Sequence, residues 1–141
     1  MCGIAGYFSA TKSLDEISLA AMTNALQHRG PDSSGFFRDD FAGLGHRRLS
    51  IIDLSSRANQ PMTSANSRYV IVYNGEVYNY REIGAMMSVR SDGSGVNQFR
   101  SSSDTEIILE GFSKWGVDVV QQLNGLFAFA IYDKQEHALY L

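Results

Sequence analysis

The sequence predicts a fold of stacked β-sheet and α-helix layers. Residues 125–132 (Gly-Leu-Phe-Ala-Phe-Ala-Ile-Tyr) are apolar on both faces, which is typical of a strand buried between two layers. Residues 13–16 (Ser-Leu-Asp-Glu) and 103–106 (Ser-Asp-Thr-Glu) have the spacing of capping boxes, so each predicts a helix start. The 141 residues are 44% hydrophobic, enough for one domain with a substantial core.

The N-terminal half predicts three strands and one helix. Gly3–Phe8 has the pattern of a short buried strand, and residues 35–38 and 44–52 predict two more, separated by a turn. The helix that starts at residue 13 ends before Gly30 and Pro31. Its expected apolar stripe consists of Leu14, Ile17, Ala21 and Ala25.

The C-terminal half repeats the pattern of strands and helices. Residues 69–73 predict a strand that is followed by Asn74 and Gly75, and residues 80–87 predict a short helix that Gly84 weakens. The helix that begins in the second capping box ends at Gly116, and residues 117–123 predict one or two further helical turns.

The last four residues, 138–141, have the pattern of an apolar strand without polar termination. An unpaired apolar edge invites association, so we expect a domain truncated at its C-terminal end.

Charge and cysteine content exclude several functional classes. The net charge of -3 gives no electrostatic reason to expect nucleic acid or an anionic membrane as partner. The single cysteine excludes an intrachain disulfide and fits a reducing compartment, and the start resembles neither a signal peptide nor a membrane span, so we expect a cytoplasmic protein. The scattered histidines form no ligand cluster, so no metal is expected. Phosphate-binding loop motifs are lacking.

The single cysteine, Cys2, directly follows the initiator methionine. A small second residue permits removal of Met1, which would leave a thiol and a free α-amine on one residue. An α-amine titrates near ~7.7–8.0, far below a lysine at ~10.4, so it can accept the thiol proton at neutral pH. The alternative is that Cys2 packs as a small buried hydrophobic residue.

Five stretches, in order along the whole chain, resemble the class II glutamine amidotransferases. They are Met-Cys-Gly-Ile-Ala-Gly (1–6), His-Arg-Gly-Pro-Asp (28–32), Arg-Leu-Ser-Ile-Ile-Asp (48–53), Tyr-Asn-Gly-Glu-Val-Tyr-Asn (73–79) and Ser-Asp-Thr-Glu (103–106). Residues 59–62 and 123–129 are similar to a connecting turn and a core strand of that domain. Together these stretches are most similar to the glutaminase half of asparagine synthetase and its relatives.

The resemblance implies an α+β fold, the four-layer αββα sandwich of the N-terminal-nucleophile hydrolases. Residues 1–141 would form a type-2 glutamine amidotransferase domain, incomplete at its C-terminal end and without the synthetase domain. Its reaction would release ammonia and glutamate from glutamine through a cysteinyl thioester. The glutaminase reaction would need no cofactor, whereas ATP and Mg would belong to the missing synthetase domain.

The resemblance also implies roles for individual residues. Cys2 would be the nucleophile, and the Asn74 side-chain amide with the Gly75 N–H would stabilise the oxyanion. Arg48 would bind the substrate carboxylate and Asp104 its ammonium group. The other implied substrate-binding residues are Leu49, Ile52, Glu76, Arg29 and Gly30.

Each of these assignments has a structural alternative. Asn-Gly between apolar runs is a strong hairpin signal, so Asn74 and Gly75 could form only a turn. Residues 103–106 could be only a helix cap, Arg29 and Gly30 an ordinary helix stop, and Arg48 a surface strand residue.

The function also has alternatives. A truncated chain could be an inactive fragment, a glutamine-binding module or an interaction surface. For an active domain, the expected partners are glutamine and a synthetase domain or acceptor partner. The acceptor of the ammonia (aspartate, a sugar or another group) stays open, and so does a homodimer.

Overall fold

The computed structural model describes residues 2–9, 16–51, 53–88 and 99–141. These residues form two antiparallel sheets, with helices packed outside the sheets. The first sheet has the order β1-β3-β2 and the second the order β4-β5-β6-β7. Segregated helices and antiparallel sheets make this a mixed α+β arrangement. The strands are β1 (Gly3–Phe8), β2 (Ser33–Arg38), β3 (Ala42–Arg48), β4 (Met62–Thr63), β5 (Tyr69–Val77), β6 (Gly125–Asp133) and β7 (Ala138–Tyr140).

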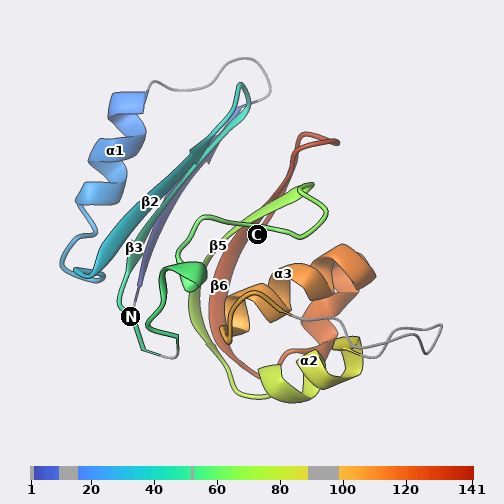
Figure 1. Ribbon diagram of the computed structural model, residues 1–141. Helices are drawn as coiled ribbons and strands as arrows, with labels where there is room; N and C mark the ends of the chain where they lie inside the picture. Colours follow the sequence, from blue (N-terminus) through green and yellow to red (C-terminus); the bar gives the residue numbers. More distant parts are fainter. Residues whose placement is uncertain (1, 10–15, 52, 89–98) are drawn as a thin grey trace.

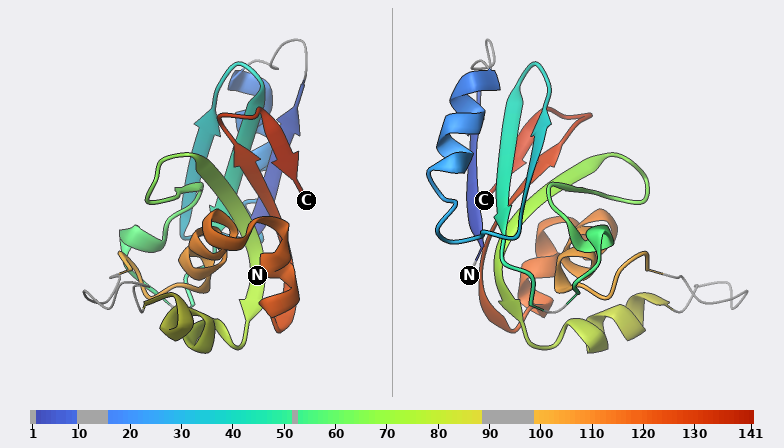
Figure 2. Two further views of the ribbon diagram at one scale, coloured as in Figure 1. Left: turned by 90° about the vertical axis from the view of Figure 1, so that its right-hand side faces the viewer. Right: turned by 60° about the vertical axis from the view of Figure 1, so that its left-hand side comes forward.

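The helices lie on the outer faces of the two sheets (Figures 1 and 2). Helix α1 (Glu16–Asn24) covers the first sheet, whereas α2 (Tyr80–Ser88) and α3 (Asp104–Trp115) lie beyond the second. Two short 3₁₀ helices, η1 (Ser56–Ala58) and η2 (Gly116–Gln122), complete the described elements.

Two apolar clusters hold the layers together. The first lies between the sheets, where Leu44 of β3 packs with Val70 and Val72 of β5 and with Tyr132 of β6. The second lies between the second sheet and the helices. Its largest fully buried members are Ile71, Ile83, Ile108, Leu109 and Ile131. The second sheet is therefore covered on both faces at residues 70–73 of β5 and 130–133 of β6. In the first half of β6, Leu126 and Ala128 are exposed, so the burial predicted for residues 125–132 is confirmed only in its second half.

Local sequence signals locate several elements well. The strand at Gly3–Phe8 and the helix at 80–87 are confirmed, the latter extended by one residue. The second capping box is confirmed, because the Ser103 side chain accepts a hydrogen bond from the Glu106 N–H at the start of α3. At its other end α3 is capped by Gly116, whose φ of 60° suits glycine.

The expected stripe of the first helix is wrong where it can be examined. Ala21 and Ala25 are exposed, and Leu19 and Thr23 are buried instead. Thr23 occupies the space that a side chain at Gly45 of β3 would fill. Because Gly45 has no Cβ, this face of α1 can pack closely against the sheet. The predicted start at residues 13–15 lies outside the described residues, and nothing is described of the Ile17 side chain.

Two predicted boundaries are also corrected. The strand predicted over residues 44–52 ends at Arg48, because Leu49 and Ser50 leave the sheet. Asn74 and Gly75 form no hairpin turn: β5 runs through them to Val77, and they pair with Ala128 and Phe127 of β6. Here the long-range partner strand overrides the local turn preference.

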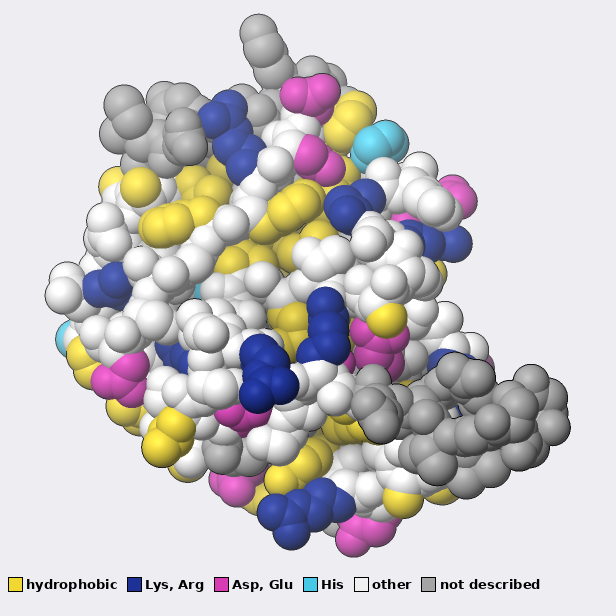
Figure 3. Space-filling view, in the orientation of Figure 1, with side chains coloured by type: hydrophobic (Ala, Val, Ile, Leu, Met, Phe, Trp, Pro, Cys, Tyr) yellow, Lys and Arg dark blue, Asp and Glu magenta, His cyan; other side chains and the backbone are white. Residues whose placement is uncertain are grey.

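On the face shown in Figure 3, basic and acidic side chains are interspersed rather than segregated. This mixture agrees with the small net charge of -3.

Candidate active site

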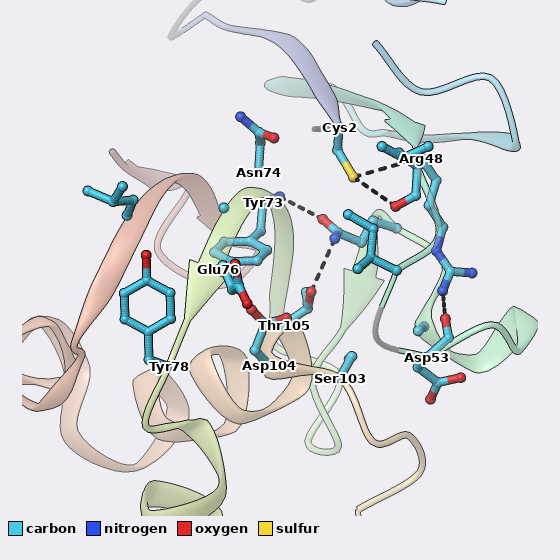
Figure 4. Close-up of a pocket in the computed structure, with 16 residues that line it drawn as sticks. Cys2, Arg48, Asp53, Tyr73, Asn74, Glu76, Tyr78, Ser103, Asp104 and Thr105 are labelled. Atoms are coloured by element: carbon cyan, nitrogen blue, oxygen red, sulfur yellow. Dashed lines mark hydrogen bonds between the residues drawn. The ribbon is translucent and has the colours of Figure 1, made fainter.

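A cavity of about 230 Å³ opens where the ends of β1 and β3 meet β5 and the start of α3. In the view of Figure 4, Cys2 and Asn74 lie at one end of it, and Ser103 and Asp104 at the other. Its size suits a small ligand. The sequence-predicted site residues among its lining are Cys2, Arg48, Leu49, Asn74, Gly75, Glu76 and Asp104.

Cys2 immediately precedes β1, and its half-buried side chain faces the cavity. The Leu49 N–H donates to the sulfur at 3.4 Å, and the thiol lies 3.6 Å from the Leu49 carbonyl oxygen. The Cys2 carbonyl oxygen accepts a 3.0 Å hydrogen bond from Arg29 Nε. The residue is thus held on both its backbone and its side chain, and its sulfur stays accessible from the cavity.

The backbone of β5 presents one free donor to the cavity. In an antiparallel ladder, alternate residues direct their N–H groups to the neighbouring strand. The Tyr78 N–H donates to the carbonyl oxygen of Asn124, which directly precedes β6, so even-numbered amides of β5 point toward β6. The odd-numbered amides therefore point to the other edge of β5, away from β6. There Tyr73 N–H donates to Gln60 Oε1 at 2.6 Å and Val77 N–H to Asp104 Oδ2 at 3.1 Å.

Gly75 lies between these two capped amides. By the same alternation, its N–H points to the cavity side, and no hydrogen bond to it is found among the described residues. Glycine is required here, because a Cβ would collide with the backbone of Leu126 and Phe127 on β6. The neighbouring Asn74 side-chain oxygen is buried and likewise has no partner in the described part of the chain.

Arg48 is buried at 7% exposure, and only neutral groups accept its hydrogen bonds. Its Nη1 donates to the Ser55 carbonyl oxygen at 2.9 Å and to Asn59 Oδ1 at 2.7 Å, and Nη2 donates to the Asp53 carbonyl oxygen. A guanidinium has five N–H donors, so Nε–H and one hydrogen of Nη2 remain. A buried cation with two spare donors suits a carboxylate ligand.

Asp104 occupies the first turn of α3 with 5% exposure. Its Oδ2 accepts the Tyr73 hydroxyl at 2.7 Å and the Val77 N–H at 3.1 Å, while Oδ1 accepts no hydrogen bond from the described residues. Burial, together with the Asp104 carboxylate, raises the pKa of the Tyr73 phenol far above its usual range. The phenol therefore stays a donor, and one carboxylate oxygen of Asp104 remains for a cation.

The loop that holds Arg48 is tied to the start of α3 through Asp53. The Asp53 carboxylate accepts hydrogen bonds from Ser55 N–H at 2.8 Å and from Ser102 N–H at 2.9 Å. Hydrogen bonds from Ser55 and Ser102 hold the pKa of this carboxyl well below its usual range. The carboxylate thus connects the segment that binds Arg48 to the residues that precede α3.

Two further predicted site residues, Arg29 and Gly30, do not line the cavity. Arg29 lies in the turn after α1 and contacts the backbone of Cys2, and Gly30 packs against the backbone of Arg47. Ile52 lies outside the described residues.

Sequence reasoning missed part of the lining. Tyr73 directly precedes Asn74 and Asp53 ends the Arg48 segment, so both stand in stretches that the motif comparison had singled out. Gln60 stands in another such stretch, but its role depends on tertiary contacts to Tyr73 and Thr105. The full set of missed lining residues is Ile51, Asp53, Ala58, Gln60, Tyr73, Tyr78, Ser103, Thr105 and Leu126.

The described residues form neither a metal site nor a membrane-spanning helix. Among the described residues, no group of three or more His, Cys, Asp or Glu side chains is arranged to hold a metal ion. The helices of this same part of the chain include none with the length and apolarity to cross a membrane.

Comparison with known proteins identifies relatives that match almost the whole chain. The chain is 37% identical over 144 residues to asparagine synthetase [glutamine-hydrolyzing] 1 of Bacillus subtilis (strain 168), covering 99% of this chain and 22% of the relative. It is 36% identical over 140 residues to asparagine synthetase B [glutamine-hydrolyzing] of Escherichia coli (strain K12), covering 98% of this chain and 24% of the relative.

A putative asparagine synthetase [glutamine-hydrolyzing] 2 of Methanocaldococcus jannaschii is 35% identical over 158 residues, with 99% of this chain and 29% of that protein covered. The chain therefore spans only a minor part of the length of these relatives. The family model described as the glutamine amidotransferase domain matches residues 1–141. The chain accordingly belongs to the glutamine amidotransferase domain family.

Proposed function

We propose that this domain hydrolyses glutamine to glutamate and ammonia, with Cys2 as nucleophile after loss of Met1. The observation that carries the proposal is the meeting of Cys2, the unpartnered Gly75 N–H and the uncompensated Arg48 in one cavity. Family membership supports the same reaction. The layer order of helix, sheet, sheet and helices supports our assignment to the N-terminal-nucleophile hydrolases.

The first step forms a thioester. The α-amine of Cys2 accepts the thiol proton, and the sulfur attacks the side-chain amide carbon of glutamine. The negative charge that develops on the amide oxygen is stabilised by the Gly75 N–H and the Asn74 side-chain amide. Collapse of the tetrahedral intermediate breaks the C–N bond, and the α-ammonium returns its proton to the departing nitrogen as ammonia leaves.

The second step regenerates the thiol. A water molecule gives a proton to the α-amine and attacks the thioester carbon, forming an oxyanion at the same donors. Breaking the C–S bond releases glutamate, and the sulfur takes back the proton. Both steps use only Cys2, the donors of β5 and water, so we expect no cofactor for this half-reaction.

Arg48 and Asp104 explain recognition of an amino acid. The two spare donors of Arg48 would bind the substrate carboxylate. The free oxygen of Asp104 and the nearby Glu76 would bind its ammonium group. Leu49 lines the same cavity, and Arg29 and Gly30 lie next to the backbone of Cys2 and Arg47. We also assign substrate contact to Ile52. Asparagine would leave its amide carbon short of the sulfur, because it lacks one methylene.

We further propose that the ammonia serves an acceptor reaction in a synthetase domain or partner protein, where ATP and Mg would be used. The relatives are named asparagine synthetases, which supports aspartate as one acceptor. A reactive free thiol at the nucleophile position fits the reducing cytoplasm.

Intact-mass spectrometry before and after treatment with a diazo-ketone glutamine analogue tests the proposal. We expect a species that lacks Met1 and gains one adduct, and we expect ammonia release from glutamine but not from asparagine. Cys2→Ala should abolish both adduct and ammonia, whereas a protein with Met1 retained and no adduct would overturn the proposal. Asp40→Asn, an exposed carboxylate outside the cavity lining, serves as the matched control and should behave as the parent chain.

A further inference from the structure

His46 connects the two sheets next to the cavity without lining it. It lies on β3 of the first sheet with 1% exposure, and its Nε2 is 3.2 Å from the carbonyl oxygen of Tyr73 on β5 of the second sheet. A carbonyl oxygen only accepts hydrogen bonds, so Nε2 carries the hydrogen and donates. The bond therefore crosses from one sheet to the other.

The Tyr73 carbonyl needs this donor because its strand lacks a neighbour there. Strand β4 pairs only Met62 with Ile71 and Thr63 with Val70. Continuation of that register would place Gln60 opposite Tyr73, but the strand has ended, and the Gln60 side chain bonds the Tyr73 N–H instead. Two side chains thus replace the missing backbone partner, with Gln60 on the N–H and His46 on the C=O.

His46 lies between the proposed nucleophile, Cys2, and the proposed oxyanion donors, Asn74 and Gly75. In the ladder of β1 and β3, His46 pairs with Ile4, two residues after Cys2. Its acceptor Tyr73 directly precedes Asn74 and lies two residues before Gly75. The nucleophile belongs to the first sheet and the oxyanion donors to the second, so this bond constrains the distance between them.

We propose that His46 is a positioning residue that sets the separation of Cys2 from the Gly75 and Asn74 donors. The inference rests on the proposed function, since it assigns the two groups that are positioned. His46 does not act as the general base, because it is absent from the lining of the cavity in which the reacting groups meet. Burial also lowers its pKa to about 4, so the imidazole is neutral at pH 7 and serves as a fixed donor.

Two matched variants separate positioning from packing. His46→Gln keeps an N–H donor near the position of Nε2, whereas His46→Met has a similar length and no donor. We expect His46→Met to lower kcat for glutamine hydrolysis by roughly 10- to 100-fold, because small displacements of reacting groups have effects of this size. KM should change by less than about 3-fold, since Arg48 and Asp104 are untouched, and His46→Gln should retain kcat within about 3-fold of the parent chain.

Backbone amide chemical shifts provide a readout that is independent of turnover. We expect the Asn74 and Gly75 amide resonances to move in His46→Met and to stay near their parent positions in His46→Gln. The inference is overturned if the two variants share the same kcat and the same amide shifts, or if His46→Met changes KM rather than kcat. If the parent chain neither hydrolyses glutamine nor reacts with the diazo-ketone, the proposed function fails, and the amide shifts still decide whether His46 positions this strand.

Discussion

Arg48 and Arg68 differ in the charge of the groups that accept their hydrogen bonds. Arg68 donates from Nε and Nη2 to both oxygens of the Asp133 carboxylate, at 2.6 to 3.0 Å, and its side chain is 31% exposed. Arg48 is more deeply buried, yet it contacts only carbonyl groups and one amide oxygen. Among the described residues, no carboxylate forms an ion pair with it.

This difference distinguishes a structural ion pair from a prepared binding site. Burial of a charge is costly unless a counter-charge or several hydrogen bonds compensate it. Asp133 compensates Arg68 within the fold, so the pair joins the start of β5 to the end of β6. The charge of Arg48 is compensated only by hydrogen bonds to neutral oxygens, so it can still attract the carboxylate of a ligand. The comparison predicts that one arginine acts on stability and the other on substrate binding.

The largest effect is expected at the structural pair. Asp133→Asn should lower the free energy of unfolding by about 3 kcal/mol, because the buried carboxylate accepts charge-assisted hydrogen bonds from Arg68 and from the backbone N–H groups of residues 135 and 136. KM for glutamine should stay unchanged. Urea denaturation measures the first quantity and initial rates the second.

The matched control is Glu136→Gln, whose carboxylate lies 3.8 Å from Arg68 with a side chain that is 69% exposed. We expect it to change the free energy of unfolding by less than about 0.5 kcal/mol. Equal effects of the two substitutions would break the comparison.

The second prediction concerns pH and the neighbourhood of Arg48. Burial, and to a smaller extent the charge of Arg48, lower the pKa of His46 from 6.5 to about 4. Between these values the unfolded chain binds the proton and the folded chain does not. The stability is therefore complete above about pH 6.5 and falls by up to about 3 kcal/mol as the pH approaches 4.

Urea denaturation of the parent chain and of His46→Gln over this pH range isolates this contribution, because the carboxylates titrate in both. A difference between the two proteins that does not vary with pH would show that His46 is not the group responsible.

The third prediction tests the binding role of Arg48. Arg48→Lys keeps the charge but loses the planar fork, so we expect kcat/KM for glutamine to fall by roughly 30-fold, or about 2 kcal/mol, mainly through KM. Steady-state kinetics measures this split. Arg68→Lys is the parallel variant and should leave KM unchanged, so a rise in KM for both would contradict the assigned roles.

The smallest effect sharpens the electrostatic side of the comparison. Arg48→Met removes the nearby cation and should raise the pKa of His46 by less than about one unit, since burial is the larger cause of the lowered value. Imidazole resonances followed by NMR titration report the change. A lower pKa in the variant would exclude Arg48 as a source of the shift.

The fold was predictable where local signals and burial agree. The caps of α3 and the buried second half of β6 follow from short-range patterns. The predicted buried face of α1 was wrong, because that face is determined by the close approach of the helix to Gly45. The possible turn at Asn74 does not form, because pairing with β6 outweighs the local turn preference. Such outcomes depend on partners remote in sequence.

The site likewise contains residues that local sequence motifs predict and residues whose roles depend on tertiary contacts. Cys2, Arg48 and Asp104 stand in recognisable motifs, and the structure brings them to one cavity. The roles of Gln60 and His46 could not be anticipated, because a buried polar side chain acquires its function from the backbone group it meets. For His46 that group is the Tyr73 carbonyl, 27 positions away.

The amides of β5 alternate in direction along the strand. Tyr73, Gly75 and Val77 direct their N–H groups to the cavity edge because they are an even number of positions apart. A one-residue shift in the register of β5 against β6 would turn the Gly75 amide into the ladder, whereas a two-residue shift would restore its direction. The register of two strands is thus as much a determinant of the site as the side chains that line it.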